Sequence, residues 1–132
     1  MFIKQYFVTF FTFLMIDGVW LTVVAKNFYA KNLGYLMAKT PNLAAAGIFY
    51  LIYILGMVVL VISPSLQKGS IMTAILTGAL FGLCGYATYD LTNLATIKDW
   101  PLLVTIVDLV WGTFVSGTVA GISYWILTKW FF

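Results

Sequence analysis

Aspartates inside apolar stretches are the residues of this chain best suited to chemistry. The sequence has four acidic residues, all aspartate, and Asp17, Asp90 and Asp108 stand among uncharged side chains. A charged carboxylate in the middle of a membrane costs at least about 2.5–3.5 kcal/mol on insertion scales, so such residues face a bundle interior and usually mark function. Because no lysine lies in the same stretches except Lys129 at the very end of the last one, we expect these carboxyls to be protonated, to share protons or to hold a cation.

The three aspartates have matched positions along their stretches. Each lies eight or nine residues from the charged residue that bounds its stretch, which is a rise of about 12–13 Å in an α-helix. Because successive spans alternate in direction, these rises are measured from one membrane face. Tyr50 has a similar depth on the remaining span, eight residues after Asn42. The spacing predicts one polar layer shared by four helices; the alternative is hydrogen bonding that only joins the helices.

Two of the aspartates belong to a repeated motif. Asp17-Gly-Val-Trp20 in the first stretch is echoed by Asp108-Leu-Val-Trp111 in the last. A spacing of three residues puts each aspartate and its tryptophan on the same helix face. Since the two spans run in opposite directions, the echo indicates an inverted pseudo-repeat of the kind found in transporters. The alternative is a chance occurrence of two interfacial tryptophans near acids.

Tyrosines and an asparagine extend the candidate site. Tyr53 follows Tyr50 by three residues, and a stripe of small residues spaced by four leads to Tyr86 and Asp90, with Asn93 close to the same face. The stripe consists of Ala74, Gly78 and Gly82. Such stripes let helices approach closely, so they direct the residues that follow into the bundle. We call the candidate proton- or ligand-binding residues the acidic–aromatic layer: Asp17, Trp20, Tyr50, Tyr53, Tyr86, Asp90, Asn93, Asp108 and Trp111.

The composition indicates what holds these residues in place. Of 132 residues, 63% are hydrophobic and 8% charged, against about 45–50% and 25% in soluble domains, and the mean hydropathy is +1.03. A soluble domain of this size could not cover itself with so few polar side chains. The sequence therefore predicts an all-α, polytopic membrane protein with a single domain over residues 1–132.

Four stretches meet the requirement of about 20 mainly apolar residues for a hydrocarbon core of about 30 Å. They cover about residues 5–25, 43–63, 69–97 and 101–130 and predict a four-helix transmembrane bundle. Residues 26–42 could form a helix lying in the headgroup layer or an irregular loop. A cleaved signal peptide is the alternative for the first stretch, but Asp17 interrupts it and no small-x-small cleavage site follows.

Several functional classes are disfavoured by the residue types. The net charge is only +3 and no arginine occurs, so a nucleic-acid surface is not expected. With no histidine and a single cysteine, Cys84, we expect no transition-metal site, no internal disulfide and no cofactor. The lysines divide almost evenly between the two predicted faces, so the positive-inside rule does not fix the orientation.

Particular segments resemble a known family. They are Tyr86-Ala-Thr-Tyr-Asp-Leu-Thr-Asn-Leu-Ala95, Asp17-Gly-Val-Trp20, Phe49-Tyr-Leu-Ile-Tyr53, and Trp100-Pro followed by Asp108-x-x-Trp-Gly112. The chain resembles, over nearly its whole length, a bacterial family of small predicted membrane proteins catalogued as a domain of unknown function, number twenty-one seventy-seven. The resemblance implies a multi-pass protein of the bacterial inner membrane and carries no assigned reaction.

Three functional classes remain from the sequence. The acidic–aromatic layer could bind or translocate a proton, a cation or a lipophilic cationic or polar molecule, with carboxylates supplying charge and aromatic faces supplying cation–π contacts. It could instead fix helix register in an accessory or scaffold subunit. An enzyme acting on a lipid through an aspartate acid–base is less favoured, because no nucleophile–base pair is visible. By analogy with small four-helix exporters, we expect membrane lipids and a second copy of the chain as partners.

Overall fold

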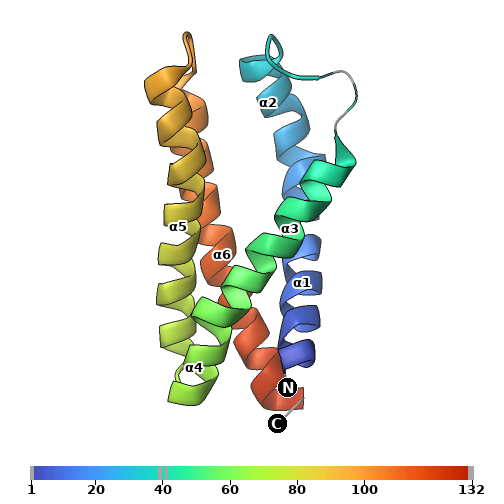
Figure 1. The fold of residues 1–132 in the computed structure, drawn as a ribbon, viewed down its shortest axis with the longest axis vertical. Helices are drawn as coiled ribbons and strands as arrows, with labels where there is room; N and C mark the ends of the chain where they lie inside the picture. The colour runs from blue at the N-terminus through green and yellow to red at the C-terminus, as the bar shows by residue number, and fades with distance from the viewer. Residues whose placement is uncertain (1, 39, 41, 131–132) are drawn as a thin grey trace.

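The computed structural model describes residues 2–38, 40 and 42–130, which form helices joined by short connections and contain no strand (Figure 1). Four continuous helices are long and apolar enough to cross a membrane: Phe2–Leu33, Leu43–Lys68, Ile71–Thr96 and Leu102–Trp130. The two ends of the described chain lie at the same end of the bundle (Figure 1), as an even number of spans requires. The predicted all-α fold with four membrane-spanning helices is confirmed.

Two of the four helices contain a π-helical segment. The first helix consists of α1 (Phe2–Val19), η1 (Trp20–Ala25) and α2 (Lys26–Leu33), and the second of α3 (Leu43–Met57), η2 (Val58–Ile62) and α4 (Ser63–Lys68). A π-helical turn closes i→i+5 hydrogen bonds and holds more residues than an α turn, and such segments are frequent at functional sites. Residues beyond η1 therefore face a different direction from the one that α-helical spacing predicts.

The segment after residue 25 differs from the prediction of an interfacial helix or an irregular loop. Residues 26–33 (KNFYAKNL) continue the first helix as α2 instead, because they contain no glycine or proline to stop it. The helix ends at Leu33, immediately before Gly34. Residues 39 and 41 of this stretch lie outside the described residues.

Side-chain and glycine caps explain where the remaining helices begin and end. The side chain of Asn42 accepts a hydrogen bond from the backbone N–H of Ala45 at the start of α3. Ser70 does the same for Thr73 at the start of α5 (Ile71–Thr96), and both residue types are favoured at this position. Gly69 closes α4 with φ of 73°, a left-handed conformation that glycine adopts at little cost.

The most extensive helix pair is α5 with α6 (Leu102–Trp130), which lie side by side until the C-terminal part of α6 turns away towards α1 (Figure 1). A Cβ atom at Gly78 would stand 2.6 Å from the Cβ of Ala120 and 2.9 Å from the carbonyl oxygen of Ser116. On the other helix, a Cβ at Gly117 would stand 3.2 Å from the carbonyl oxygen of Ile75. Small residues on both helices thus allow backbone-to-backbone packing, as in other membrane helix pairs.

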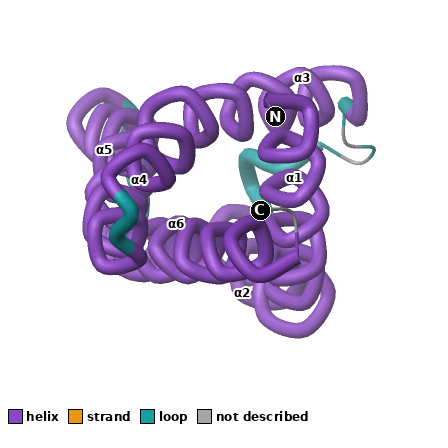
Figure 2. The backbone as a smooth tube through the Cα atoms, turned by 90° about the horizontal axis from the view of Figure 1, so that it is seen from below, coloured by secondary structure: helices purple, strands orange, loops and turns teal. Residues whose placement is uncertain are grey.

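The remaining helices complete the bundle around this pair. Viewed along the bundle, α6 and the α3–α4 helix each span one side, and α5 and the first helix form the other two (Figure 2). The α3–α4 helix crosses obliquely, so that α4 packs against α5 while α3 packs against α1 (Figure 1). As a result, α3 and α5 diverge towards the end of the bundle that holds α2.

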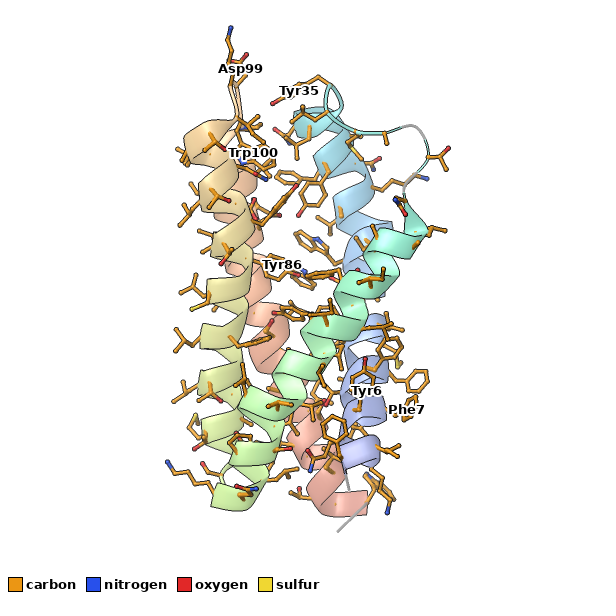
Figure 3. The ribbon with its side chains drawn as sticks, viewed as in Figure 1. Tyr6, Phe7, Tyr35, Tyr86, Asp99 and Trp100 are labelled. Atoms are coloured by element: carbon orange, nitrogen blue, oxygen red, sulfur yellow. The ribbon has the colours of Figure 1, made fainter. Side chains whose placement is uncertain are left out.

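The bundle has an apolar core that also contains polar side chains, and its outer surface is largely apolar. Exposed positions carry large apolar residues, such as Phe7, which points away from the helices (Figure 3). Side chains with polar or charged groups that are buried include Gln5, Thr9, Asp17, Ser65, Asp90, Thr105, Asp108, Ser116 and Ser123. This distribution suits a protein surrounded by lipid, where polar groups must find partners in the interior.

Candidate functional site

Asp17 on α1 accepts hydrogen bonds from two other helices. The hydroxyl of Tyr50 on α3 donates to its Oδ2 at 2.7 Å, and the indole N–H of Trp111 on α6 donates to its Oδ1 at 3.2 Å. The aspartate is only 5% exposed. Each carboxyl oxygen therefore has a donor, and the residue joins α1, α3 and α6.

The two tryptophans of the repeated motif stack on each other. The rings of Trp20 and Trp111 have centroids 4.3 Å apart and planes within 10° of parallel. Trp111 in turn donates to the aspartate of the other motif, Asp17. The two copies of Asp-x-x-Trp thus meet where the first helix crosses α6.

Asp108 has a partner that the sequence analysis missed. The hydroxyl of Tyr29 on α2 donates to Oδ1 of Asp108, and the indole of Trp20 lies close enough to interact with the same hydroxyl. Tyr29 follows Trp20 by nine residues and lies beyond η1, whose wide turn changes the direction in which α2 faces. No periodicity in the sequence marks it as part of the site.

Asp90 is buried without a hydrogen-bond partner. Its side chain is 0% exposed, and neither carboxyl oxygen is hydrogen-bonded to any of the described residues. The carboxyl of Asp108 faces it closely enough for a hydrogen bond between the two acids, which requires that one of them carries a proton. Thr105 donates to the backbone oxygen of Asp90 at 3.4 Å and accepts from the indole N–H of Trp100 at 3.0 Å, so these bonds fix the backbone of Asp90 and leave its carboxyl without a donor.

The three aspartates occupy two adjacent levels. Asp90 meets Asp108, whereas Asp17 meets Trp111, which lies three residues, or about 4.5 Å of helix, further along α6. The stacked tryptophans and Tyr29 connect the two levels. The arrangement is a continuous polar and aromatic network spread over about one helical turn.

The other residues of the predicted layer have different surroundings. Tyr53 is hydrogen-bonded to Oγ of Ser116 at 2.5 Å, a buried hydroxyl that the sequence analysis did not single out. Tyr86 points into the bundle (Figure 3) and packs on Gly112, where any Cβ atom would overlap its ring. Asn93 lies half-buried beside Tyr89 and takes no part in the hydrogen bonds of the aspartates.

Metal binding has little support from the side chains. Within residues 2–38, 40 and 42–130, no group of three or more His, Cys, Asp or Glu side chains could hold a metal ion. The pair of Asp90 and Asp108 offers only two carboxyl groups, and the nearby Tyr29 hydroxyl already donates to Asp108, whereas Ca²⁺ takes about six to eight oxygen ligands. The chemistry available to this pair is the binding of a proton or of a cation with low demands on coordination.

The stacked tryptophans should be energetically coupled. Replacing Trp20 and Trp111 by alanine, singly and together, is expected to give an interaction energy of about 1 kcal/mol, the usual value for a stacked aromatic pair. Unfolding of purified protein in mixed detergent micelles measures the four stabilities. The matched control pairs Trp20 with Trp125, which is half exposed at the other end of α6. The control pair should show additive losses of stability. Additive losses for Trp20 and Trp111 as well would contradict a coupled stack.

Comparison with known proteins gives one match. A family model described as "Predicted membrane protein (DUF2177)" matches residues 2–125, a range that includes every residue of the acidic–aromatic layer. No curated protein and no solved structure matches the chain. The resemblance inferred from the sequence motifs is confirmed.

Proposed function

The chain belongs to this family of predicted membrane proteins, and we propose that its acidic–aromatic layer binds a proton or a cation within the membrane. The pair of Asp90 and Asp108 forms the binding site, and Asp17 supports it from the adjacent level. Following the resemblance noted above, we propose the bacterial inner membrane as the location of the protein.

The surroundings of Asp90 carry this proposal. A buried polar group without a partner costs about 1–3 kcal/mol, and more when it is charged. In the hydrocarbon core of a membrane, no water is available to form the missing hydrogen bond. A proton shared between Asp90 and Asp108, or a bound cation, would satisfy both carboxyls at once. The burial of Asp90 with both oxygens unpartnered is the observation that favours a site occupied by such an ion.

The alternative of purely structural aspartates is supported at Asp17 but not at Asp90. Asp17 receives donors from Tyr50 and Trp111 and thereby joins three helices, which is the expected role of an interhelical hydrogen-bonding residue. Asp90 has no donor from another helix, and among the described residues the only polar side chain that it meets is the carboxyl of Asp108. An aspartate that served only packing could be replaced by asparagine without loss of ion binding, whereas an ion-binding aspartate could not.

Infrared spectroscopy of the carboxyl groups tests the proposal. With protein reconstituted in lipid vesicles, the parent should show a pH-dependent C=O band from a buried protonated carboxyl. Asp90→Asn should remove that band, because the amide cannot lose a proton. Asp17→Asn, the matched control on another helix, should retain it. A competing monovalent cation should displace the band if the site also accepts a cation.

Two results would contradict the proposal. One is a spectrum of Asp90→Asn that matches the parent at every pH, because the band would then come from another group. The other is the absence of any pH-dependent carboxyl band in the parent together with no response to cations. Either result would assign the layer to helix packing.

A further inference from the structure

A groove lined by aromatic rings lies between α3 and α5. It consists of two adjoining pockets of about 410 and 430 Å³ that share Phe49, Tyr53 and Gly85. We call it the aromatic groove; its first pocket is lined by Phe49, Tyr53, Gly85, Tyr86 and Tyr89. Because Phe49 and Tyr89 are about half exposed, the groove opens onto the surface that faces lipid.

The groove follows from helix divergence and from a missing side chain. The α3 segment leaves α5 as it packs on α1 (Figure 1), and this separates the two helices. Gly85 has no side chain to fill the space, and a Cβ atom there would be 3.4 Å from the ring of Tyr53. A larger residue at position 85 would therefore occupy the groove.

The inner wall of the groove adjoins the aspartates. Tyr53 and Tyr86 both line the groove and interact electrostatically with Asp17. The buried carboxyl of Asp17 therefore lies within electrostatic range of two rings of the groove.

The third tyrosine of the first pocket also lies near aspartates. Tyr89 interacts electrostatically with both Asp90 and Asp108. Every tyrosine of the first pocket thus lies within electrostatic range of at least one aspartate. The groove combines an aromatic lining with aspartates nearby. No lysine lies between residues 43 and 67 or between 69 and 97, the stretches that contain its two walls.

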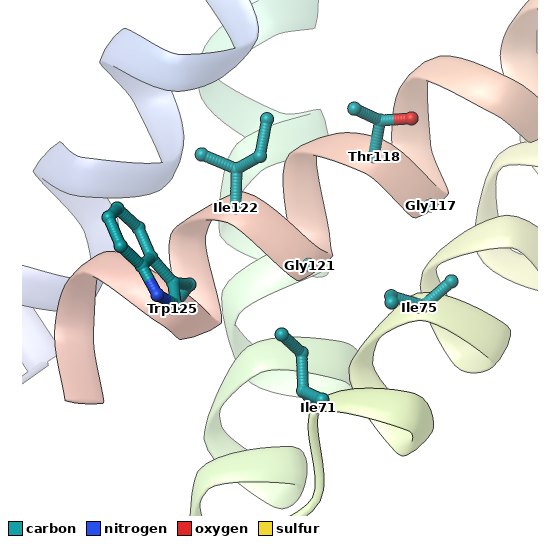
Figure 4. Close-up of a pocket in the computed structure, with 7 residues that line it drawn as sticks. All are labelled: Ile71, Ile75, Gly117, Thr118, Gly121, Ile122 and Trp125. Atoms are coloured by element: carbon teal, nitrogen blue, oxygen red, sulfur yellow. The ribbon is translucent and has the colours of Figure 1, made fainter. Parts of the chain in front are cut away.

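The pocket shown in Figure 4 lacks these features. It lies between α5 and α6, has a volume of about 390 Å³, and is lined by Ile71, Ile75, Gly117, Thr118, Gly121, Ile122 and Trp125. Its lining contains no aspartate and no tyrosine, and Trp125 is its one aromatic side chain. Lipid chains suffice to fill such a surface.

We infer that the aromatic groove binds a lipophilic organic cation, such as an amine or a quaternary onium ion with apolar substituents, which enters from lipid between α3 and α5. Its volume lies in the range of small-molecule sites, about 300–1,000 Å³. A cation against desolvated aromatic rings gains about 2 kcal/mol from each good contact. The inference rests on the proposed function, because the aspartates of the acidic–aromatic layer supply the negative field.

Binding of tetraphenylphosphonium to the purified full chain tests the inference. Calorimetry in detergent should show saturable binding to the parent, and no saturable binding of the neutral triphenylphosphine oxide. Gly85→Leu, which fills the groove, should weaken binding about tenfold or more through lost aromatic contacts. Gly47→Leu is the matched control, because Gly47 is an exposed helical glycine with nothing within 4 Å of its added Cβ, and it should bind like the parent.

The outcomes separate this inference from the proposed function. Gly85→Leu should keep the pH-dependent carboxyl band, which reports the aspartate pair alone. Equal affinity of Gly85→Leu and the parent, or equal binding of the neutral compound, would overturn the groove as a cation site while the band stands. If Gly85→Leu does not give a monodisperse protein, Tyr89→Leu replaces it, since this change keeps bulk and removes one aromatic face. Loss of the band in the parent would instead overturn the proposed function.

Discussion

Replacing Gly82 by alanine should lower the stability of the bundle by about 3 kcal/mol, at the upper end of the usual range for overpacking. A Cβ atom at this position would overlap the carbonyl oxygen of Gly112 and stand 2.6 Å from the Cβ of Ser116. A backbone oxygen cannot rotate away as a flexible side chain can. The two helices α5 and α6 would therefore have to separate, and their close contact would be weakened along its length.

The comparison that isolates this effect is Gly47→Ala. Gly47 also lies in a helix, but nothing stands within 4 Å of an added Cβ. Alanine favours helix over glycine by about 1 kcal/mol, so this variant should match or exceed the parent. Unfolding with increasing sodium dodecyl sulfate in mixed micelles measures both. Equal stabilities for the two variants would show that α5 and α6 do not approach as closely as described.

The packing of α5 is the part of the site most accessible to sequence reasoning. Ala74, Gly78 and Gly82 recur every four residues, a spacing that keeps residues on one face of an α-helix. All three are buried, as is Asp90 at the end of the same face. Helical periodicity is a local property of the backbone, so it can be read wherever the helix is regular.

Tyr29 could not be predicted, because the helix before it is not regular. The π-helical segment Trp20–Ala25 changes the phase between α1 and α2, and its formation depends on packing with other helices as much as on its own residues. Lys26 and Lys31 also suggested that the chain leaves the membrane after residue 25. A helix can continue past the apolar region as long as no residue breaks it, and this brings Tyr29 to Asp108.

The sequence also could not distinguish the three aspartates from one another. All three are single acids in apolar helices at similar depth, but Asp17 has two donors, Asp108 has one and Asp90 has none. These differences depend on helix rotation and on the side-chain rotamers of partners from other helices. Neither is determined by the spacing of residues within one helix.

The different surroundings of Asp17 and Asp90 predict changes in stability of opposite sign. Asp17→Ala should destabilise the protein by about 3 kcal/mol, because the Tyr50 hydroxyl and the Trp111 N–H lose their acceptor and each unsatisfied group costs about 1–3 kcal/mol. Lipid cannot replace the acceptor. Asp90→Asn should stabilise the protein by about 1 kcal/mol, since the amide can donate a hydrogen bond to Asp108 and that gain is typical of one hydrogen bond.

Unfolding in mixed micelles at neutral pH measures both variants against the parent. Asp17→Asn serves as an intermediate control, because its amide oxygen still accepts one hydrogen bond while its NH₂ group faces a second donor, so it should fall between Asp17→Ala and the parent. A loss of stability in Asp90→Asn comparable to that of Asp17→Ala would mean that Asp90 has a structural partner. If Asp90→Asn is more stable than the parent and loses the carboxyl band, Asp90 binds an ion at a cost in stability. Residues of functional sites often lower the stability of a protein in this way.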